Sequence, residues 1–135
     1  MSAMTSKERV LAALRREEPD RVPHFEWMVD KKVRYALEPD HTDPNDFYVR
    51  IGADAVLADP VFKKERISEN RQRSEWGYVT QDTDEEHGIE VESPIKTMAD
   101  FEAFDPPDPH APGRMDAIKS VMAKYDDEKA VVVHL

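Results

Sequence analysis

Two polar side chains near the start of the chain have the chemistry of an acid–base or ligand-binding pair. His24 and Glu26 are two residues apart in segment 22–27, which we expect to be a strand, so both side chains lie on one face. A histidine beside a carboxylate can exchange protons or hold a ligand. An interior polar pair that bonds to a neighbouring strand is the alternative.

Two further polar residues follow apolar runs that we expect to be buried parallel strands. Asp59 comes directly after the run Ala55–Ala58, and His134 lies at the end of the run that begins at Ala130. A carboxylate at Asp59 would bind a cationic or N–H-bearing ligand, or would instead cap the turn before Pro60. Because the carboxyl ends of strands face the active site in a parallel barrel, a functional role stays open at these positions beside the structural one.

These positions give a candidate site for a small-molecule substrate, built from three strand ends. We assign Glu26 and Asp59 as catalytic residues, and His24, Trp27 and His134 as substrate-binding residues. No metal site is predicted within this chain. Cysteine is absent, and the His-x-Glu and Asp-x-His pairs offer only two ligands each.

Composition narrows the classes of partner. The 135 residues include 29 Asp and Glu against 19 Lys and Arg, a net charge of −10, which is unfavourable for binding a phosphate backbone. The four glycines are too scattered to form a glycine-rich phosphate loop. No apolar stretch approaches the roughly 20 residues that a membrane-spanning helix needs. We therefore expect a cytoplasmic protein that binds neither nucleic acid nor membrane.

The spacing of apolar residues predicts helices that alternate with strands. Thr5 begins a capping-box pattern before an expected helix over residues 6–17, which Pro19 would end. Polar caps and apolar periodicity mark the other elements in the same way. The remaining expected helices begin after Asp30, Asp43 and Thr97 or cover residues 115–125, and the expected strands cover 22–27, 55–58 and 130–135.

The middle of the chain interrupts this alternation. Segments 75–80 and 88–92 resemble strands joined by an acidic stretch, which predicts an antiparallel β-hairpin inserted over residues 74–93. The preceding segment 61–73 contains five basic and two acidic residues, a local charge of +3. We expect a solvated loop there, with a site for a carboxylate-rich ligand or a partner protein as the alternative.

The valine-rich strand at 130–135 needs neighbours on both faces. Three parallel strands with their helices leave open edges, and a complete (β/α)8 barrel takes roughly 200 to 250 residues. We therefore expect residues 1–135 to be the first part of a single α/β barrel domain. A self-sufficient small α/β domain, or one chain of a split protein, is the alternative.

Several short motifs resemble the start of the uroporphyrinogen decarboxylase superfamily. The opening Met4–Leu14 and the segment Glu18–Pro23 look like its N-terminal sequence, and four later segments fit the pattern in the expected order. Those segments are Gly52–Val56, Glu75–Gly77, Ser93–Lys96 and Asp105–Pro109. The chain is more closely similar to the branch of corrinoid-dependent methyltransferases and decarboxylase-like proteins. The resemblance implies the N-terminal part of a (β/α)8 TIM barrel preceded by a helix.

The resemblance also implies a reaction for the complete protein. The methyltransferase branch transfers a methyl group between a methylated substrate or thiol and a corrinoid carrier, and a zinc ion held by one His and two Cys acts as Lewis acid. Because this chain has no Cys, zinc and a corrinoid partner protein would serve only the complete protein. We expect the chain alone to be inactive.

Two alternatives to methyl transfer stay open. Uroporphyrinogen III decarboxylation, a step of porphyrin biosynthesis, needs no cofactor. That family binds its substrate through an arginine-rich segment after the first strand and an Asp after the second. Here Glu26–Asp30 stands in place of the arginines, whereas Asp59 falls near the family's Asp. The second alternative is a non-catalytic module whose exposed strands pair with a second chain that completes the barrel.

Overall fold

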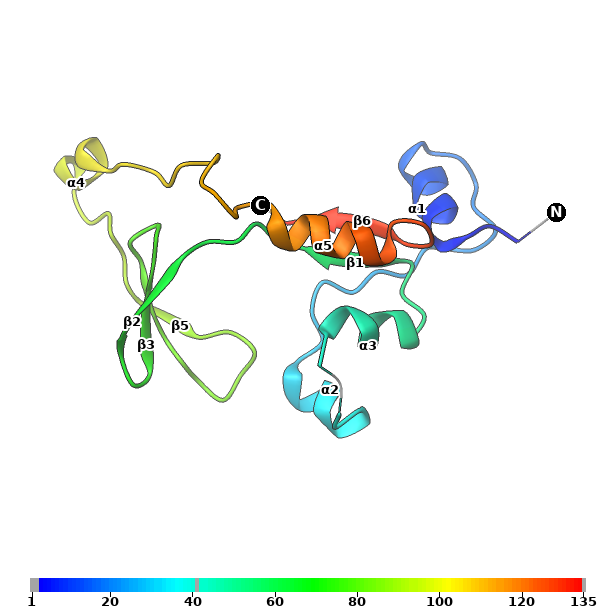
Figure 1. Ribbon diagram of the computed structural model, residues 1–135, viewed down its shortest axis with the longest axis horizontal. Coiled ribbons are helices and arrows are strands. Elements are labelled where there is room, and N and C mark those ends of the chain that lie inside the picture. The colour runs from blue at the N-terminus through cyan, green and yellow to red at the C-terminus, as the bar shows by residue number, and fades with distance from the viewer. Residues whose placement is uncertain (1–2, 41, 135) are drawn as a thin grey trace. The chain divides into compact units, whose positions relative to one another are not determined.

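The computed structural model describes residues 3–40 and 42–134, which form two compact units (Figure 1). Unit 1 contains the residues up to Pro60 together with those from Met115 onward, and unit 2 contains Val61–Arg114. Unit 1 combines helices with a parallel strand pair, and unit 2 is built around an antiparallel sheet. The fold is therefore mixed α/β, and its membership of a barrel stays a prediction.

The parallel pair of unit 1 consists of β1 (Ala55–Ala58) and β6 (Ala130–Val133). The two strands run in register from Ala55 opposite Ala130 to Ala58 opposite Val133. Most of β1 is buried, as its continuous apolar run predicts, whereas β6 is buried only at Ala130. Both strands confirm the sequence-based expectation, and the final residue of the expected 130–135 strand, Leu135, lies outside the described residues.

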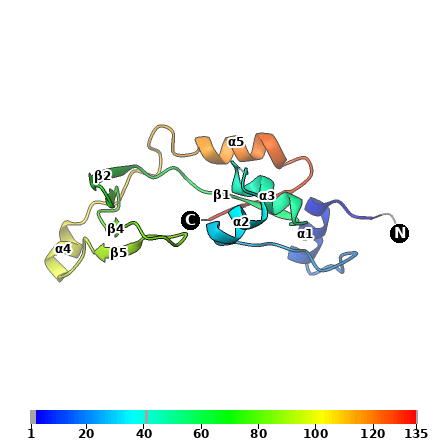
Figure 2. The same cartoon turned by 90° about the horizontal axis from the view of Figure 1, so that it is seen from below.

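Helices surround this strand pair. The α5 helix runs alongside both strands, as Figures 1 and 2 show, and α1 and α3 also contact β1. Side chains of Thr5, Asp30 and Asp43 accept hydrogen bonds from the first turns of three of the helices, which confirms the predicted caps. The helices of unit 1 are α1 (Ser6–Leu14), α2 (Lys31–Leu37), α3 (Pro44–Arg50) and α5 (Asp116–Tyr125).

The first helix ends earlier than the sequence predicts. Arg16 has a φ of 62°, in the left-handed region, and the helix ends at Leu14, five residues before Pro19. The N–H of Arg16 donates to the carbonyl of Ala13, and the N–H of Glu17 donates to that of Ala12. This is a Schellman arrangement with a non-glycine residue at the position that usually holds glycine. Expecting the helix to continue to residue 17 was wrong for that reason.

Unit 1 is held together by an apolar cluster and by a polar link between helices. Phe47, Tyr48 and Ala53 form the buried cluster at the end of α3. On the neighbouring side, the hydroxyl of Tyr125 in α5 donates to Asp46 Oδ1 of α3 at 2.5 Å. Burial and this hydrogen bond raise the pKa of Tyr125 to about 12.

The expected strand over residues 22–27 is wrong, because this extended segment joins neither sheet of the described chain. Pro23 has no N–H, and the N–H of His24 donates to a side chain, Asp54 Oδ2, at 2.8 Å. On β1, the N–H of Leu57 donates to Asn45 Oδ1 at 3.0 Å, and its carbonyl accepts from Asn45 Nδ2 at 2.8 Å. The Asn45 amide thus occupies backbone groups that a neighbouring strand would need.

Unit 2 is an antiparallel meander in the order β2-β3-β4-β5, followed by a short helix. The β4–β5 pair confirms the predicted hairpin pairing, although β4 begins only after a turn that contains Gly77. The expected solvated loop over 61–73 is wrong, because most of that segment forms two charged strands, of which β2 is exposed and β3 is partly buried. The elements are β2 (Lys64–Ser68), β3 (Arg71–Ser74), β4 (Val79–Gln81), β5 (Ile89–Glu92) and α4 (Met98–Ala103).

One buried arginine organises the base of unit 2. Arg114 donates to both carboxylate oxygens of Glu75 and to the carbonyls of Val61 and Asp108. Its guanidinium also lies 4.4 Å from the centre of the Phe62 ring. The hydrogen bonds from Arg114 hold the pKa of Glu75 below its ordinary value. The hydrogen bonds between Arg114 and Val61 join the two ends of unit 2, and the ion pair attaches them to Glu75.

Candidate functional site

The ends of the parallel strands bring two candidate residues together. Asp59 follows β1 and His134 follows β6, and the register that places Ala58 opposite Val133 makes the next two residues neighbours. Their side chains approach to 3.7 Å between His134 Nδ1 and Asp59 Oδ1, which is an ion pair when the imidazole is protonated. The parallel topology thus produces the juxtaposition that the sequence predicts.

The second candidate pair lies in the extended segment before α2. His24 Nε2 is 3.1 Å from Glu26 Oε1, which is hydrogen-bonding distance. The contact itself shows that both side chains lie on one side, although the backbone here is assigned to no strand and is part of neither described sheet. The predicted pairing of His24 with Glu26 is therefore present, but it does not depend on the strand that was expected over residues 22–27.

Trp27 contacts the second of the two histidines. Its ring centre lies 5.5 Å from that of His134, with the ring planes tilted by 59°. The structure thus brings Trp27, His134 and Asp59 together as one group and His24 and Glu26 together as another. The roles of all five residues in binding or catalysis stay predictions.

The site is open to solvent. The side chains of His24 and Glu26 are 39% and 46% exposed, and those of His134 and Asp59 are 57% and 61% exposed. Asp59 thus places an exposed carboxylate beside the imidazole of His134, which contacts the Trp27 ring, and Glu26 places another beside His24. Such a set favours a ligand with a cationic or N–H group, and each imidazole can pass a proton to its carboxylate or to a ligand.

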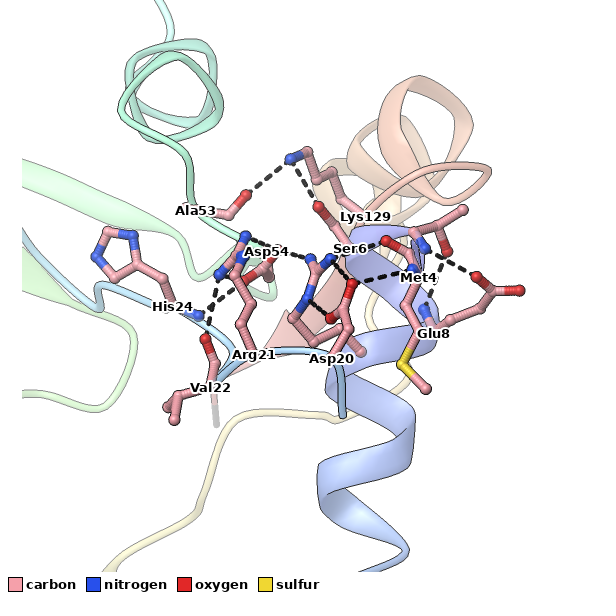
Figure 3. A network of polar contacts seen from close by, with 12 residues as sticks. Met4, Ser6, Glu8, Asp20, Arg21, Val22, His24, Ala53, Asp54 and Lys129 are labelled. Atoms are coloured by element: carbon pink, nitrogen blue, oxygen red, sulfur yellow. Dashed lines mark hydrogen bonds and ion pairs between the residues drawn. The ribbon is translucent and has the colours of Figure 1, made fainter. Parts of the chain in front are cut away.

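A buried carboxylate that the sequence-based predictions missed lies at the opposite end of β1 from Asp59. Asp54 is fully buried immediately before β1 and accepts hydrogen bonds from two arginines (Figure 3). Arg9 Nη1 donates to Asp54 Oδ1 at 2.6 Å, and Arg21 donates to both carboxylate oxygens at 2.8 Å. The backbone N–H of His24 also donates to Asp54, at 2.8 Å from Oδ2. Burial alone raises the pKa of Asp54, and these hydrogen bonds outweigh it and lower the pKa.

Arg9 also binds a second carboxylate. Its Nε donates to Asp20 Oδ1 at 2.5 Å, and its Nη2 donates to Asp20 Oδ2 at 2.9 Å. These bonds hold the pKa of Asp20 well below its ordinary range. On the same side of the network, Lys129 Nζ donates to the Ser6 hydroxyl and to the carbonyl of Ala53. The network thus joins α1, residues 20–24, and the residues that directly precede β1 and β6.

The short motifs of the sequence contain the residues of this network, but the motifs do not reveal that these residues contact one another. Arg9, Asp20, Arg21 and Asp54 all belong to the short motifs that carry the resemblance to the uroporphyrinogen decarboxylase superfamily. In the structure these residues form ion pairs with one another, and of the four only Arg9 and Asp54 are buried.

The residues present do not fit a zinc centre. Within the described ranges 3–40 and 42–134, no three His, Asp or Glu side chains gather closely enough to hold a metal ion, and the sequence has no Cys. The two His–carboxylate pairs offer two donors each. We therefore derive no chemical step through a metal bound to this chain.

Comparison with known proteins adds no relative. No family model matches the chain, and no match was found among curated proteins or solved structures. Among the described helices, none has the length and apolar character needed to cross a membrane. A proposal of function therefore depends on the geometry of the site and on the short motifs of the sequence.

Proposed function

We propose that the strand ends of unit 1 form a binding site for a small molecule that presents a cationic or N–H group. The observation that carries this proposal is the contact of Trp27 and Asp59 with the same imidazole, that of His134. A carboxylate and an aromatic face beside one hydrogen-bonding ring suit a positively polarised ligand.

In this proposal, Glu26 and Asp59 are the catalytic residues, and His24, Trp27 and His134 contact the substrate. Each carboxylate would accept a proton or a hydrogen bond from the ligand, while its imidazole partner would orient the carboxylate and exchange the proton with solvent. The half-exposed side chains leave both carboxylates accessible to a ligand.

The reaction we propose for the complete protein is methyl transfer between a methylated substrate or thiol and a corrinoid carrier. The resemblance of the opening motifs to the methyltransferase-like branch supports this reaction. A bound corrinoid and zinc would supply methyl transfer and Lewis acidity, but no cluster among the described residues fits the zinc. The chain by itself is thus proposed to bind substrate without turning it over, in the cytoplasm.

Decarboxylation of uroporphyrinogen III is the second candidate, because an accessible carboxylate at Asp59 can accept pyrrole N–H groups. It needs no corrinoid, so two assays of the protein that contains this chain separate the reactions. One supplies methylcobalamin with a thiol, and the other supplies uroporphyrinogen III. If neither assay shows activity, the result favours a non-catalytic module that pairs with a second chain.

The test of the site uses two conservative variants in whichever assay shows turnover. We expect Glu26→Gln and Asp59→Asn each to lower kcat/KM by roughly tenfold or more, because each removes a proton acceptor. Glu65→Gln, on the exposed strand β2, is the matched control and should leave turnover unchanged. Wild-type kinetics in both site variants would remove these carboxylates from the proposed site.

A further inference from the structure

We infer that Asp54 is a positioning residue, which fixes the backbone of His24 and thereby the His24–Glu26 pair. The value of that pair for binding rests on the proposed function, whereas the positioning itself is a property of the fold. Two hydrogen bonds join His24 and Asp54, and each of the two residues donates one of them.

The two hydrogen bonds define the His24 backbone closely. The N–H of His24 donates to Asp54 Oδ2 at 2.8 Å, and the carbonyl of His24 accepts from the N–H of Asp54 at 2.7 Å. Both backbone groups of His24 are therefore bound to one residue. In a sheet a neighbouring strand would supply both bonds, whereas here the side chain of Asp54 accepts one and its backbone N–H donates the other, because segment 22–27 joins neither described sheet.

Asp54 can hold His24 because Asp54 is itself immobilised. Its carboxylate is fully buried and receives three hydrogen bonds from Arg9 and Arg21. A buried carboxylate is costly unless such donors surround it, so its rotamer is restricted to the one that meets all of them. The carboxylate oxygen offered to His24 therefore has a fixed place at the entrance to β1.

The far end of the same segment is also attached. The N–H of Val29 donates to the hydroxyl of Tyr48 at 3.1 Å, and Tyr48 belongs to the buried cluster of unit 1. Residues 24–29 thus run between two buried anchors, and Glu26 and Trp27 lie between them. Loss of the Asp54 anchor would free the His24 end while the Val29 end stays attached.

The matched pair of variants is Asp54→Asn and Asp20→Asn. Each removes one carboxylate from Arg9, so both weaken the ion network, but only Asp54 touches His24. Amide hydrogen exchange, read residue by residue, is the measurement. We expect Asp54→Asn to speed exchange of the His24 amide at least roughly tenfold more than Asp20→Asn does, after correction for global stability.

Equal acceleration of the His24 amide in the two variants would overturn the inference, because the effect would then be one of stability alone. If the Asp54→Asn variant does not fold, amide hydrogen exchange in the wild-type protein tests the inference instead. The His24 amide should exchange much more slowly than the Glu26 amide, and equal rates would also overturn the inference.

A second readout separates this inference from the proposed function. Where turnover is measurable, Asp54→Asn should lower kcat while Asp20→Asn leaves kcat near that of the wild type, because only the first misplaces Glu26. Altered His24 exchange in Asp54→Asn together with normal turnover in Glu26→Gln would retain the positioning and reject the proposed catalytic role.

Discussion

Single charged side chains in this protein serve two separate purposes according to their burial. Asp54 and Arg9 are almost fully buried and bind one another, so their charges fix backbone segments. Glu26 and Asp59 have imidazole partners but stay roughly half exposed, so a ligand can reach them. Burial therefore distinguishes the carboxylates that support the fold from those that we propose for chemistry.

At the same scale, Arg16 offers a direct test of backbone strain. A non-glycine residue with φ of 62° is strained, so we expect Arg16→Gly to raise the free energy of unfolding by roughly 0.5–1 kcal/mol. Arg15→Gly is the control. Arg15 has an ordinary right-handed backbone, and glycine there should lower stability. Urea denaturation measures both variants, and equal signs would contradict the strain argument.

Among the elements, local signals predicted helices well and strands unevenly. Thr5, Asp43 and Thr97 announce helices because an N-cap acts on residues only two or three positions away. The strands β2 and β3 were not predicted, because a run of charged residues with few apolar ones is typical of a solvated loop. Only their pairing, such as Glu65 opposite Arg73, gives these residues a place in a sheet.

The candidate site divides in the same way. Asp59 and His134 could be placed together from the sequence, since the ends of adjacent parallel strands meet at one edge. The contact between Arg9 and Asp54 joins residues 45 positions apart and depends on how α1 packs, which no local pattern specifies. Polar contacts between residues far apart in the sequence therefore could not be predicted from the sequence.

An element-scale prediction concerns Asn45, whose amide binds both backbone groups of Leu57 in β1. We expect Asn45→Ala to destabilise unit 1 by about 1–3 kcal/mol, because it leaves a backbone donor and acceptor without partners. Asn70→Ala, in the exposed turn between β2 and β3, should change stability by less than about 0.5 kcal/mol.

Urea denaturation and amide exchange at Leu57 measure the effect of Asn45→Ala. The exchange rate of the Leu57 amide should rise in this variant and stay unchanged in Asn70→Ala. A Leu57 amide that remains protected in Asn45→Ala would show that another group holds the edge of β1.

For the whole molecule, each unit contains its own acid-sensitive ion pairs. Hydrogen bonds from Arg9 lower the pKa of Asp20 in unit 1, and those from Arg114 lower the pKa of Glu75 in unit 2. A carboxylate whose pKa is lower in the folded state stabilises the fold fully above its unfolded pKa of about 4. That stabilisation is lost as the pH falls through the folded pKa.

We therefore expect both units to lose stability progressively as the pH falls below about 4, each through its own ion pairs. Glu75→Gln should lower the stability of unit 2 at pH 7 and flatten its pH dependence, with unit 1 unchanged. Asp20→Asn should do the same to unit 1 alone. Amide exchange at pH 7 and pH 3, read separately for the two units, measures this. A change in the pH dependence of both units from one substitution would mean that they unfold together, because the charge removed lies in only one of them.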